Sequence, residues 1–328
     1  MIAGQFLPVA FSLQRLTSLT LDLQPVPLPA VPADAEPTPR LSAAHLAACT
    51  ALQKLWLRNV NVFLSPQEAL AAWQQLQHLA LFSDEMWQVA GFWTALPCMP
   101  MLTRLEVGDT NGEALEMLQD QLPAWSRLAS LDLRFYPEPA LPQLPTSLTE
   151  LTLRCADRLQ AVPVAPSLCS LLLSDCLALD IWPAGLTAMS RLTALHILAC
   201  GLGAVPAPVA ALPALEELQL YDCDLGRLPG SLAFLGSLRK LDLRMCGLEF
   251  VPLVLGSGLA SRLQHLDLSE NGVLVVNEEG LQILCSLTTL QYLGMRDMGP
   301  GRWQDWQALK DKISPLLPAC SIDIGRKK

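Results

Sequence analysis

The ten cysteines and four histidines are the residues of this sequence best suited to metal binding or nucleophilic chemistry. Cys176, Cys200, Cys223 and Cys246 each stand three residues after the last apolar residue of an LxxLxL motif, and Asn271 fills the same place in the next copy. Such a column of thiols has two interpretations, a metal ladder or a set of reduced structural cysteines. Because no CxxC pair or spaced histidine pair accompanies it, the pattern favours the structural interpretation in an intracellular protein.

The histidines offer no catalytic pairing either. His45, His78, His196 and His265 lie in separate motif copies, without a metal-binding or triad partner at a useful spacing. The chain has no GxxxxGK phosphate loop, no GxGxxG turn, no HExxH and no GxSxG elbow. We therefore predict a protein that is not an enzyme, with no catalytic residues, no cofactor-binding residues and no metal site.

Charge and hydropathy argue against nucleic-acid-binding, membrane-spanning and secreted proteins. The net charge of −9 argues against a nucleic-acid partner, because such proteins usually carry a basic surplus or a basic face. No run approaches the ~20 apolar residues that span a bilayer, so we expect no membrane span. The opening MIAGQFLPVAF has no basic residue, unlike a signal peptide, and Arg15 is the first one. We expect a cytoplasmic protein, with the cytoskeleton, the cilium or the nucleus as alternatives and secretion disfavoured.

The elements that position these residues are set by an internal repeat. The pattern LxxLxL recurs along almost the whole chain, mostly every 20 to 27 residues, and each copy with its strand is called a rung below. In LxxLxL the last two leucines are two residues apart and point to one face of a short strand. One rung cannot bury that face alone, so stacked rungs must form a parallel sheet with a continuous core. The rungs begin at Leu16, Leu52, Leu76, Leu102, Leu128, Leu148, Leu168, Leu192, Leu215, Leu238, Leu263 and Leu290, with a degenerate thirteenth at Leu317.

On these motifs the chain resembles the leucine-rich-repeat family over roughly residues 13–324. The resemblance implies an α/β solenoid of about 12–13 rungs, curved as a horseshoe. Its parallel β-sheet lines the concave face, and short helices and extended turns form the convex face. The resemblance also implies that the Cys or Asn of each rung points inward and bonds to turn backbone.

Two repeat subtypes are mixed. Residues 192–252 resemble the 23-residue intracellular, plant-like type with LPxxL, as in LEELQLYDCDLGRLPGSLAFL. Residues 145–179 are shorter Cys-containing repeats, for which we expect extended backs. The longer repeats have room for convex helices at 65–76, 277–287 and 303–317, the first with a capping box of Ser65 and Glu68.

We predict a single solenoid over 1–328 with two attachments. Six prolines in residues 24–40 exclude a helix or central strand, which indicates a loop insertion with polyproline character. Its PxxP at Pro29 and Pro32 is either a docking motif for an SH3-like groove or part of a passive insert. Residues 325–328 form a basic tail. Before the first rung we see no polar cap, which leaves three alternatives: the first segment folds over that end, a partner covers it, or the chain is a fragment.

The third, fifth and seventh residues of each rung should face the concave surface, because they alternate with the buried leucines. Arg134 and Arg154 should stack about 5 Å apart in adjacent rungs, where Asp132, Glu150 or a partner carboxylate would separate the two charges. Aromatic and arginine side chains dominate binding hot spots. The candidate partner-binding residues are Trp56, Arg58, Phe82, Glu106, Asp132, Arg134, Arg154, His196, Tyr221, Asp242, Arg244, Asp267 and Arg296.

These features predict a non-catalytic scaffold or recognition module that binds a protein partner, of unknown identity, on its concave face; the oligomeric state is left open. Three alternatives remain. One is the substrate-reading part of an F-box-type ubiquitin ligase receptor, although such receptors carry a helical module that we do not expect before Leu13. The others are a structural component of a cytoskeletal or ciliary assembly and the repeat region of an immune-type sensor, whose nucleotide-binding domain has no counterpart motif here.

Overall fold

The computed structural model describes residues 15–22, 48–58, 71–83, 99–109, 118, 121–179, 184–203, 205, 209, 211–299 and 303–325. The chain divides into two compact units. The first reaches Pro137 and also takes Pro142–Leu148, and the second takes Glu138–Leu141 and the residues from Thr149 onward. The proline-rich stretch 24–40, the start of the expected helix at 65–76 and residues 326–328 lie outside the described residues.

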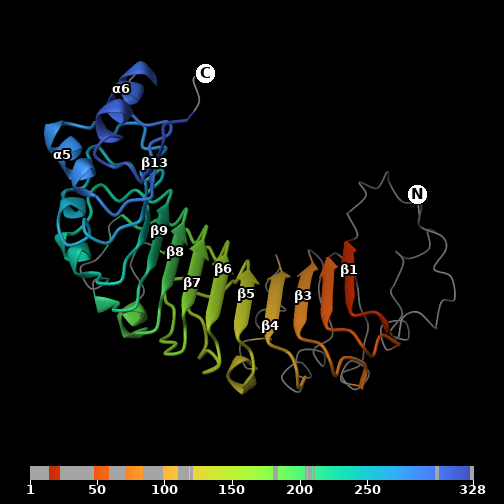
Figure 1. Cartoon of the computed structure of the whole chain (residues 1–328). Coiled ribbons are helices and arrows are strands. Elements are labelled where there is room, and N and C mark those ends of the chain that lie inside the picture. The colour runs from red at the N-terminus through yellow and green to blue at the C-terminus, as the bar shows by residue number, and fades with distance from the viewer. Residues whose placement is uncertain are drawn as a thin grey trace, which may run out of the picture. The chain divides into compact units, whose positions relative to one another are not determined.

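The first unit contains five parallel strands that pair in chain order (Figure 1). They are β1 (Ser18–Asp22), β2 (Lys54–Arg58), β3 (His78–Ser83), β4 (Arg104–Asp109) and β5 (Ser130–Arg134). A one-turn 3-10 helix, η3 (Leu122–Ala124), lies in the segment between β4 and β5.

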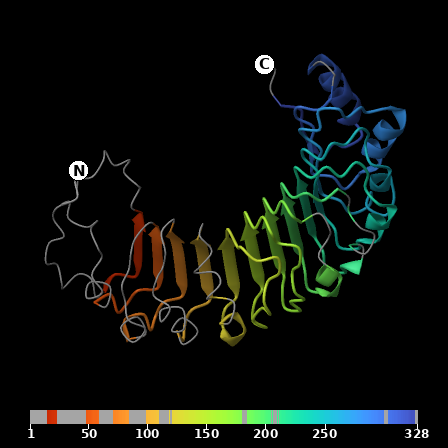
Figure 2. The same ribbon diagram turned by 180° about the vertical axis from the view of Figure 1, so that it is seen from behind.

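The second unit contains eight parallel strands, again paired in chain order. They are β6 (Glu150–Arg154), β7 (Ser170–Ser174), β8 (Ala194–Leu198), β9 (Glu217–Tyr221), β10 (Lys240–Asp242), β11 (His265–Asp267), β12 (Tyr292–Gly294) and β13 (Ser321–Asp323). Within this unit the strands line the inner side of a curve and the helices lie on its outer side (Figures 1 and 2). The degenerate thirteenth motif does overlap a strand, but its sixth residue, Ile322, pairs with Leu293, a fourth residue, so the register differs by two residues from the one predicted.

The pairing register explains the core. Apolar residues, mostly leucines, face one another in the paired strands, as in Leu55↔Leu79 and Leu57↔Leu81 of the first unit, and all four of these are buried. Fully burying one such side chain contributes roughly 2 kcal/mol relative to leaving it exposed. A slip of one residue would turn the whole leucine set to the opposite face, so the motif itself specifies the register.

The secondary structure of each repeat back depends on the length of the repeat. Between Pro137 and Leu179 the backs are extended, as their 20-residue spacing predicts. Longer repeats of the second unit carry single 3-10 turns, η4 (Ala184–Ala188), η6 (Gly230–Phe234) and η7 (Leu253–Gly256). The longest carry α-helices, α5 (Glu278–Ser286) and α6 (Trp303–Ile313), which confirms two of the expected helices. Asn277 caps α5 by accepting a hydrogen bond from the Gly280 amide at 2.8 Å.

None of the described helices combines the length and the apolar character that crossing a membrane requires.

Candidate open-face site

The face of each sheet opposite the repeat backs, called the open face below, carries the third-, fifth- and seventh-place side chains. Strand pairing aligns the fifth-place residues into columns. In the first unit the column is Thr20, Trp56, Ala80, Glu106 and Asp132. In the second unit it is Thr152, Leu172, His196, Gln219, Asp242, Asp267 and Gly294, and Asp323, the seventh residue counted from Leu317, pairs with Gly294 at its end.

Two aromatic rings and an arginine form a continuous stack on the open face of the first unit. The rings of Trp56 and Phe82 lie 5.6 Å apart between centroids, at 49° to each other. The guanidinium of Arg134 lies over the Phe82 ring, 4.6 Å from its centroid. Phe82 reaches across β4 because Gly108 leaves the space free: a Cβ at Gly108 would come within 2.7 Å of the ring. Stacking of this kind orients the arginine without hiding its charge.

Two carboxylates on this face, Glu106 and Asp132, are covered by the cations beside them. Glu106 Oε1 lies 3.0 Å from His78 Nε2 and accepts a hydrogen bond from Arg104 Nε at 2.9 Å. The hydrogen bond with His78, helped by Arg104 and opposed by burial, holds the pKa of Glu106 below its ordinary value. Asp132 Oδ1 lies 3.7 Å from Arg134 Nε. The side chains of Glu106 and Asp132 are only 12% and 13% exposed.

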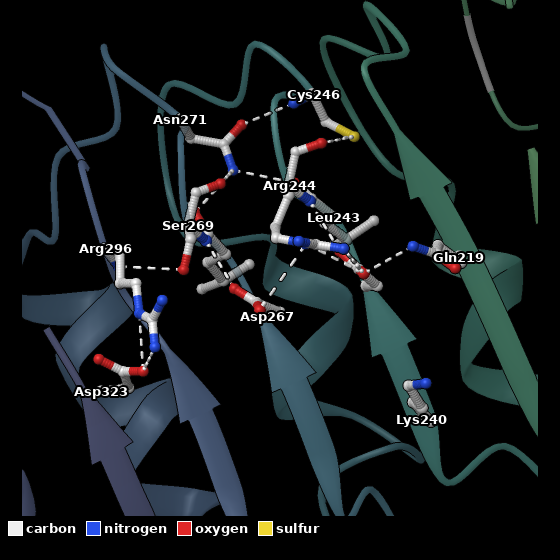
Figure 3. A network of polar contacts seen from close by, with 12 residues as sticks. Gln219, Lys240, Leu243, Arg244, Cys246, Asp267, Ser269, Asn271, Arg296 and Asp323 are labelled. Atoms are coloured by element: carbon white, nitrogen blue, oxygen red, sulfur yellow. Dashed lines mark hydrogen bonds and ion pairs between the residues drawn. The ribbon is translucent and has the colours of Figure 1, made fainter. Parts of the chain in front are cut away.

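Arg244 is the centre of the polar network in the second unit (Figure 3). It donates to Asp242 from Nη2 at 2.8 Å and from Nε at 3.0 Å, and its Nε lies 3.8 Å from Asp267 Oδ2. Its guanidinium also lies 5.1 Å from the centroid of the Tyr221 ring. Gln219 donates to the same Asp242 carboxylate at 3.0 Å. Asp242 is 4% exposed, so it acts as a buried support that fixes Arg244 rather than as an outer contact surface.

A second group surrounds Glu217. Lys240 donates to Glu217 Oε1 at 2.6 Å, and His196 Nε2 lies 3.1 Å from the same oxygen. Burial alone would raise the pKa of Glu217, but the hydrogen bond from Lys240 and the charge of His196 outweigh it, and the pKa is lowered. The ring of His265 stacks on Tyr292 at 4.4 Å, and burial, followed by the charge of Lys240, lowers the pKa of His265.

An exposed ion pair between Arg296 and Asp323 connects the last two rungs. Arg296 donates to Asp323 Oδ2 from Nε at 2.7 Å and from Nη2. The hydrogen bond from Arg296 lowers the pKa of Asp323. The backbone amide of Arg296 donates to the hydroxyl of Ser269 at 3.0 Å, which ties this rung to the preceding one.

Below this face, the inward Cys and Asn side chains connect successive rungs. Cys223 Sγ lies 3.6 Å from the Ile197 carbonyl, and Cys246 Sγ lies 2.7 Å from the Leu220 carbonyl, each in the preceding rung. Asn271 donates to the Leu243 carbonyl at 2.9 Å and accepts from the Cys246 amide at 3.0 Å. Burial raises the pKa of Cys223 to about 11 and of Cys246 to about 12, so both thiols stay protonated donors at neutral pH.

In-phase LxxLxL rungs, stacked parallel strands and an inward Cys or Asn that bonds the previous turn occur together in this chain. It is a leucine-rich-repeat solenoid. No protein-family model and no curated protein sequence matches it. Among solved structures it is similar to a leucine-rich-repeat protein of Leptospira interrogans, with 20% identity, a TM-score of 0.48, and 85% of this chain and 86% of that chain covered. It is also similar to an internalin of Listeria monocytogenes, with 20% identity, a TM-score of 0.48, and 79% of this chain and 70% of that one covered.

The solenoid brings the candidate residues into two groups, one in each unit. Trp56, Phe82, Glu106, Asp132 and Arg134 belong to the first, together with Arg58 at the end of β2. The second holds His196, Tyr221, Asp242, Arg244, Asp267 and Arg296. Arg154 ends β6, the first strand of the second unit. Its expected stacking on Arg134 spans both units and stays a prediction.

The sequence places the third residue of each rung on this face, but the candidate residues included none of these, although several contribute contacts to the site. Lys54, His78 and Arg104 in the first unit, and Glu217, Lys240, His265 and Tyr292 in the second, all occupy this third place. Reading the residue before each second leucine would have found them. Among the described residues, no group of three or more His, Cys, Asp or Glu side chains is placed to hold a metal ion, and each described cysteine is a free thiol.

Proposed function

We propose that this solenoid is a non-catalytic protein-interaction scaffold, which binds a protein partner on the open face of its sheets. One observation carries the proposal. Half-exposed arginine side chains pack against aromatic neighbours on this face, Arg134 over Phe82 and Arg244 over Tyr221. A surface that is ordered before binding loses less side-chain entropy when a partner docks, and such residues dominate binding hot spots.

The proposal is tested by capturing partners from native lysate of the source cells with the tagged full chain and identifying them by mass spectrometry. The open-face variant is Arg134→Glu/Arg154→Glu, which reverses one charge in each unit. The matched control is Arg191→Glu/Lys312→Glu, which makes the same charge change at two exposed residues outside the open face. Circular dichroism must show that both variants fold as the wild type does.

A partner that binds the wild type and the control, but not the open-face variant, supports the proposal. Partners that bind all three proteins equally contradict it, because recognition would then use another surface. The identity of a captured partner also decides between the narrower roles: adaptor and cullin subunits would indicate a ubiquitin ligase receptor, and recovery in the detergent-insoluble pellet a cytoskeletal component.

A further inference from the structure

The open face of the first unit presents cations to solvent although the chain as a whole is acidic. Lys54 and Arg58 are exposed, and the side chains of Arg104 and Arg134 are 49% and 39% exposed. Against these four cations stand Glu106 and Asp132, which the cations cover, and one exposed carboxylate, Asp22. The net charge of the chain is −9. With four cations against three carboxylates, of which two are covered, the described part of this face carries a small positive excess on an acidic protein.

The cations are arranged in two rows that flank the rings. Lys54 and Arg104 belong to the third-place row, and Arg58 and Arg134 to the seventh-place row. Strands β2 and β5 are three strand spacings apart, or roughly 14 Å. An extended segment of four to five residues, at about 3.3 Å per residue, covers that distance. One short extended segment laid across the strands can thus contact both ends of the surface.

A hollow beside Trp56 provides an apolar contact at one end of these rows. It has a volume of about 440 Å³ and lies over β1, β2 and β3, with Leu19, Leu55 and Trp56 in its lining. Lys54, His78 and the exposed carboxylate of Asp22 also line this hollow. An aromatic or large aliphatic side chain placed there would contact the indole, while neighbouring carboxylates would meet Lys54 and Arg58.

We infer that the open face of the first unit binds an acidic, extended segment of a partner protein that carries at least one aromatic or large apolar side chain. This inference rests on the proposed function and specifies its partner. The carboxylates of the segment pair with Lys54, Arg58, Arg104 and Arg134, and its apolar side chain occupies the hollow beside Trp56. Because Glu106 and Asp132 already lie beneath their own cations, they repel such a segment less than the exposed Asp22 does.

The test uses the full chain and a fluorescein-labelled ten-residue peptide of eight Asp and Glu residues with one Trp and one Phe, measured by fluorescence anisotropy at low and high salt. We expect saturable binding that weakens as salt screens the charges. Arg58→Glu and Trp56→Ala should each raise Kd about tenfold or more, the effect expected for an arginine or tryptophan anchor. Lys312→Glu makes the same charge change on α6 in the second unit and should alter Kd less than about twofold.

Two further probes are a peptide with lysine in place of each acid and a single-stranded ten-nucleotide oligo-thymidine. Equal or tighter binding of either one overturns the inference, the oligonucleotide because aromatic residues among cations also suit single-stranded nucleic acid. Equal weakening by Lys312→Glu overturns it too, because attraction would then be non-specific. If the acidic peptide does not bind, but a cellular partner still depends on the open face, the partner chemistry is wrong and the proposed function stands.

Discussion

Asn271 allows the cohesion between rungs to be tested at one buried side chain. Its Nδ2 donates to the carbonyls of Leu243 and Leu268 at 2.9 and 2.7 Å, and its Oδ1 accepts from the amides of Cys246 and Leu248 at 3.0 and 3.1 Å. All four bonds are buried. Asn271→Ala removes them together and leaves two amides and two carbonyls without this partner.

The expected loss follows from those four groups. Each buried polar group left without a partner costs roughly 1–3 kcal/mol. Water entering the space of the lost carboxamide restores part of this, so we expect a decrease of about 4 kcal/mol in the free energy of unfolding. The chain supplies a graded control, because the preceding rungs carry cysteine at this place. Asn271→Cys restores a donor but not the acceptor, and should cost about 2 kcal/mol.

The measurement is urea unfolding followed by circular dichroism, with native-state hydrogen exchange to locate the effect, because repeat arrays can open locally. In Asn271→Ala the amides of Cys246 and Leu248 should lose protection before amides in β7 or β8. Cys246→Ala, which removes only a weak thiol donor, should cost about 1 kcal/mol. If Asn271→Ala lowers the free energy of unfolding no more than Cys246→Ala does, and both amides remain protected, the inward Cys and Asn side chains do not hold the rungs together.

Three further predictions concern the open face. Arg244→Ala deprives the buried Asp242 of its main donor, so urea unfolding should show a decrease of about 2 kcal/mol in the free energy of unfolding. Adding Asp242→Ala should recover part of this decrease. If the effects of the two substitutions are purely additive, the two side chains are not coupled. Because the pKa of Glu106 is lowered in the folded protein, its contribution to stability is present above its ordinary pKa of 4.5 and is lost as pH falls through the folded value. Glu106→Gln should therefore flatten the acid side of the curve of unfolding free energy against pH. An unchanged curve would refute this reasoning. A Cβ at Gly294 would overlap the carboxylate of Asp267, so Gly294→Ala should cost about 1–3 kcal/mol in thermal or urea unfolding, whereas a neutral effect would show that Asp267 moves freely.

The repeat predicts the backbone because every rung must bury the same leucine face of a short strand against its neighbours. The leucines of β2 and β3 pair with one another, as the period requires. The degenerate motif at Leu317 overlaps β13, but in a register shifted by two residues. The inward Cys and Asn were predicted through resemblance to the family, and the contacts of Asn271 confirm that part. The extended backs of the short repeats followed from length alone.

The contacts on the open face could not be predicted in the same way, because they depend on side chains that lean sideways between rungs. A column assignment treats every fifth- or seventh-place residue as pointing straight outward. Phe82 instead crosses Gly108 to reach Arg134, and Asp267 lies against Gly294. In both cases a glycine in an outward column removes the Cβ that would keep neighbours apart. A glycine at such a position is the signal that sequence reading should use.

These two glycines support different kinds of surface. Beside Gly108 the neighbour is an aromatic ring, which orients the Arg134 charge and leaves it half-exposed. Beside Gly294 the neighbour is the Asp267 carboxylate, which lies close to Arg244 and is itself buried. Both arginines lie over a ring and near a carboxylate, but Arg134 Nε lies 3.7 Å from Asp132, whereas Arg244 donates to Asp242 at 2.8 Å. More of the attraction of Arg244 for an incoming carboxylate is therefore already satisfied internally. For this reason the stack of Trp56, Phe82 and Arg134, rather than the denser network around Arg244, is the stronger candidate for recognition of an acidic partner.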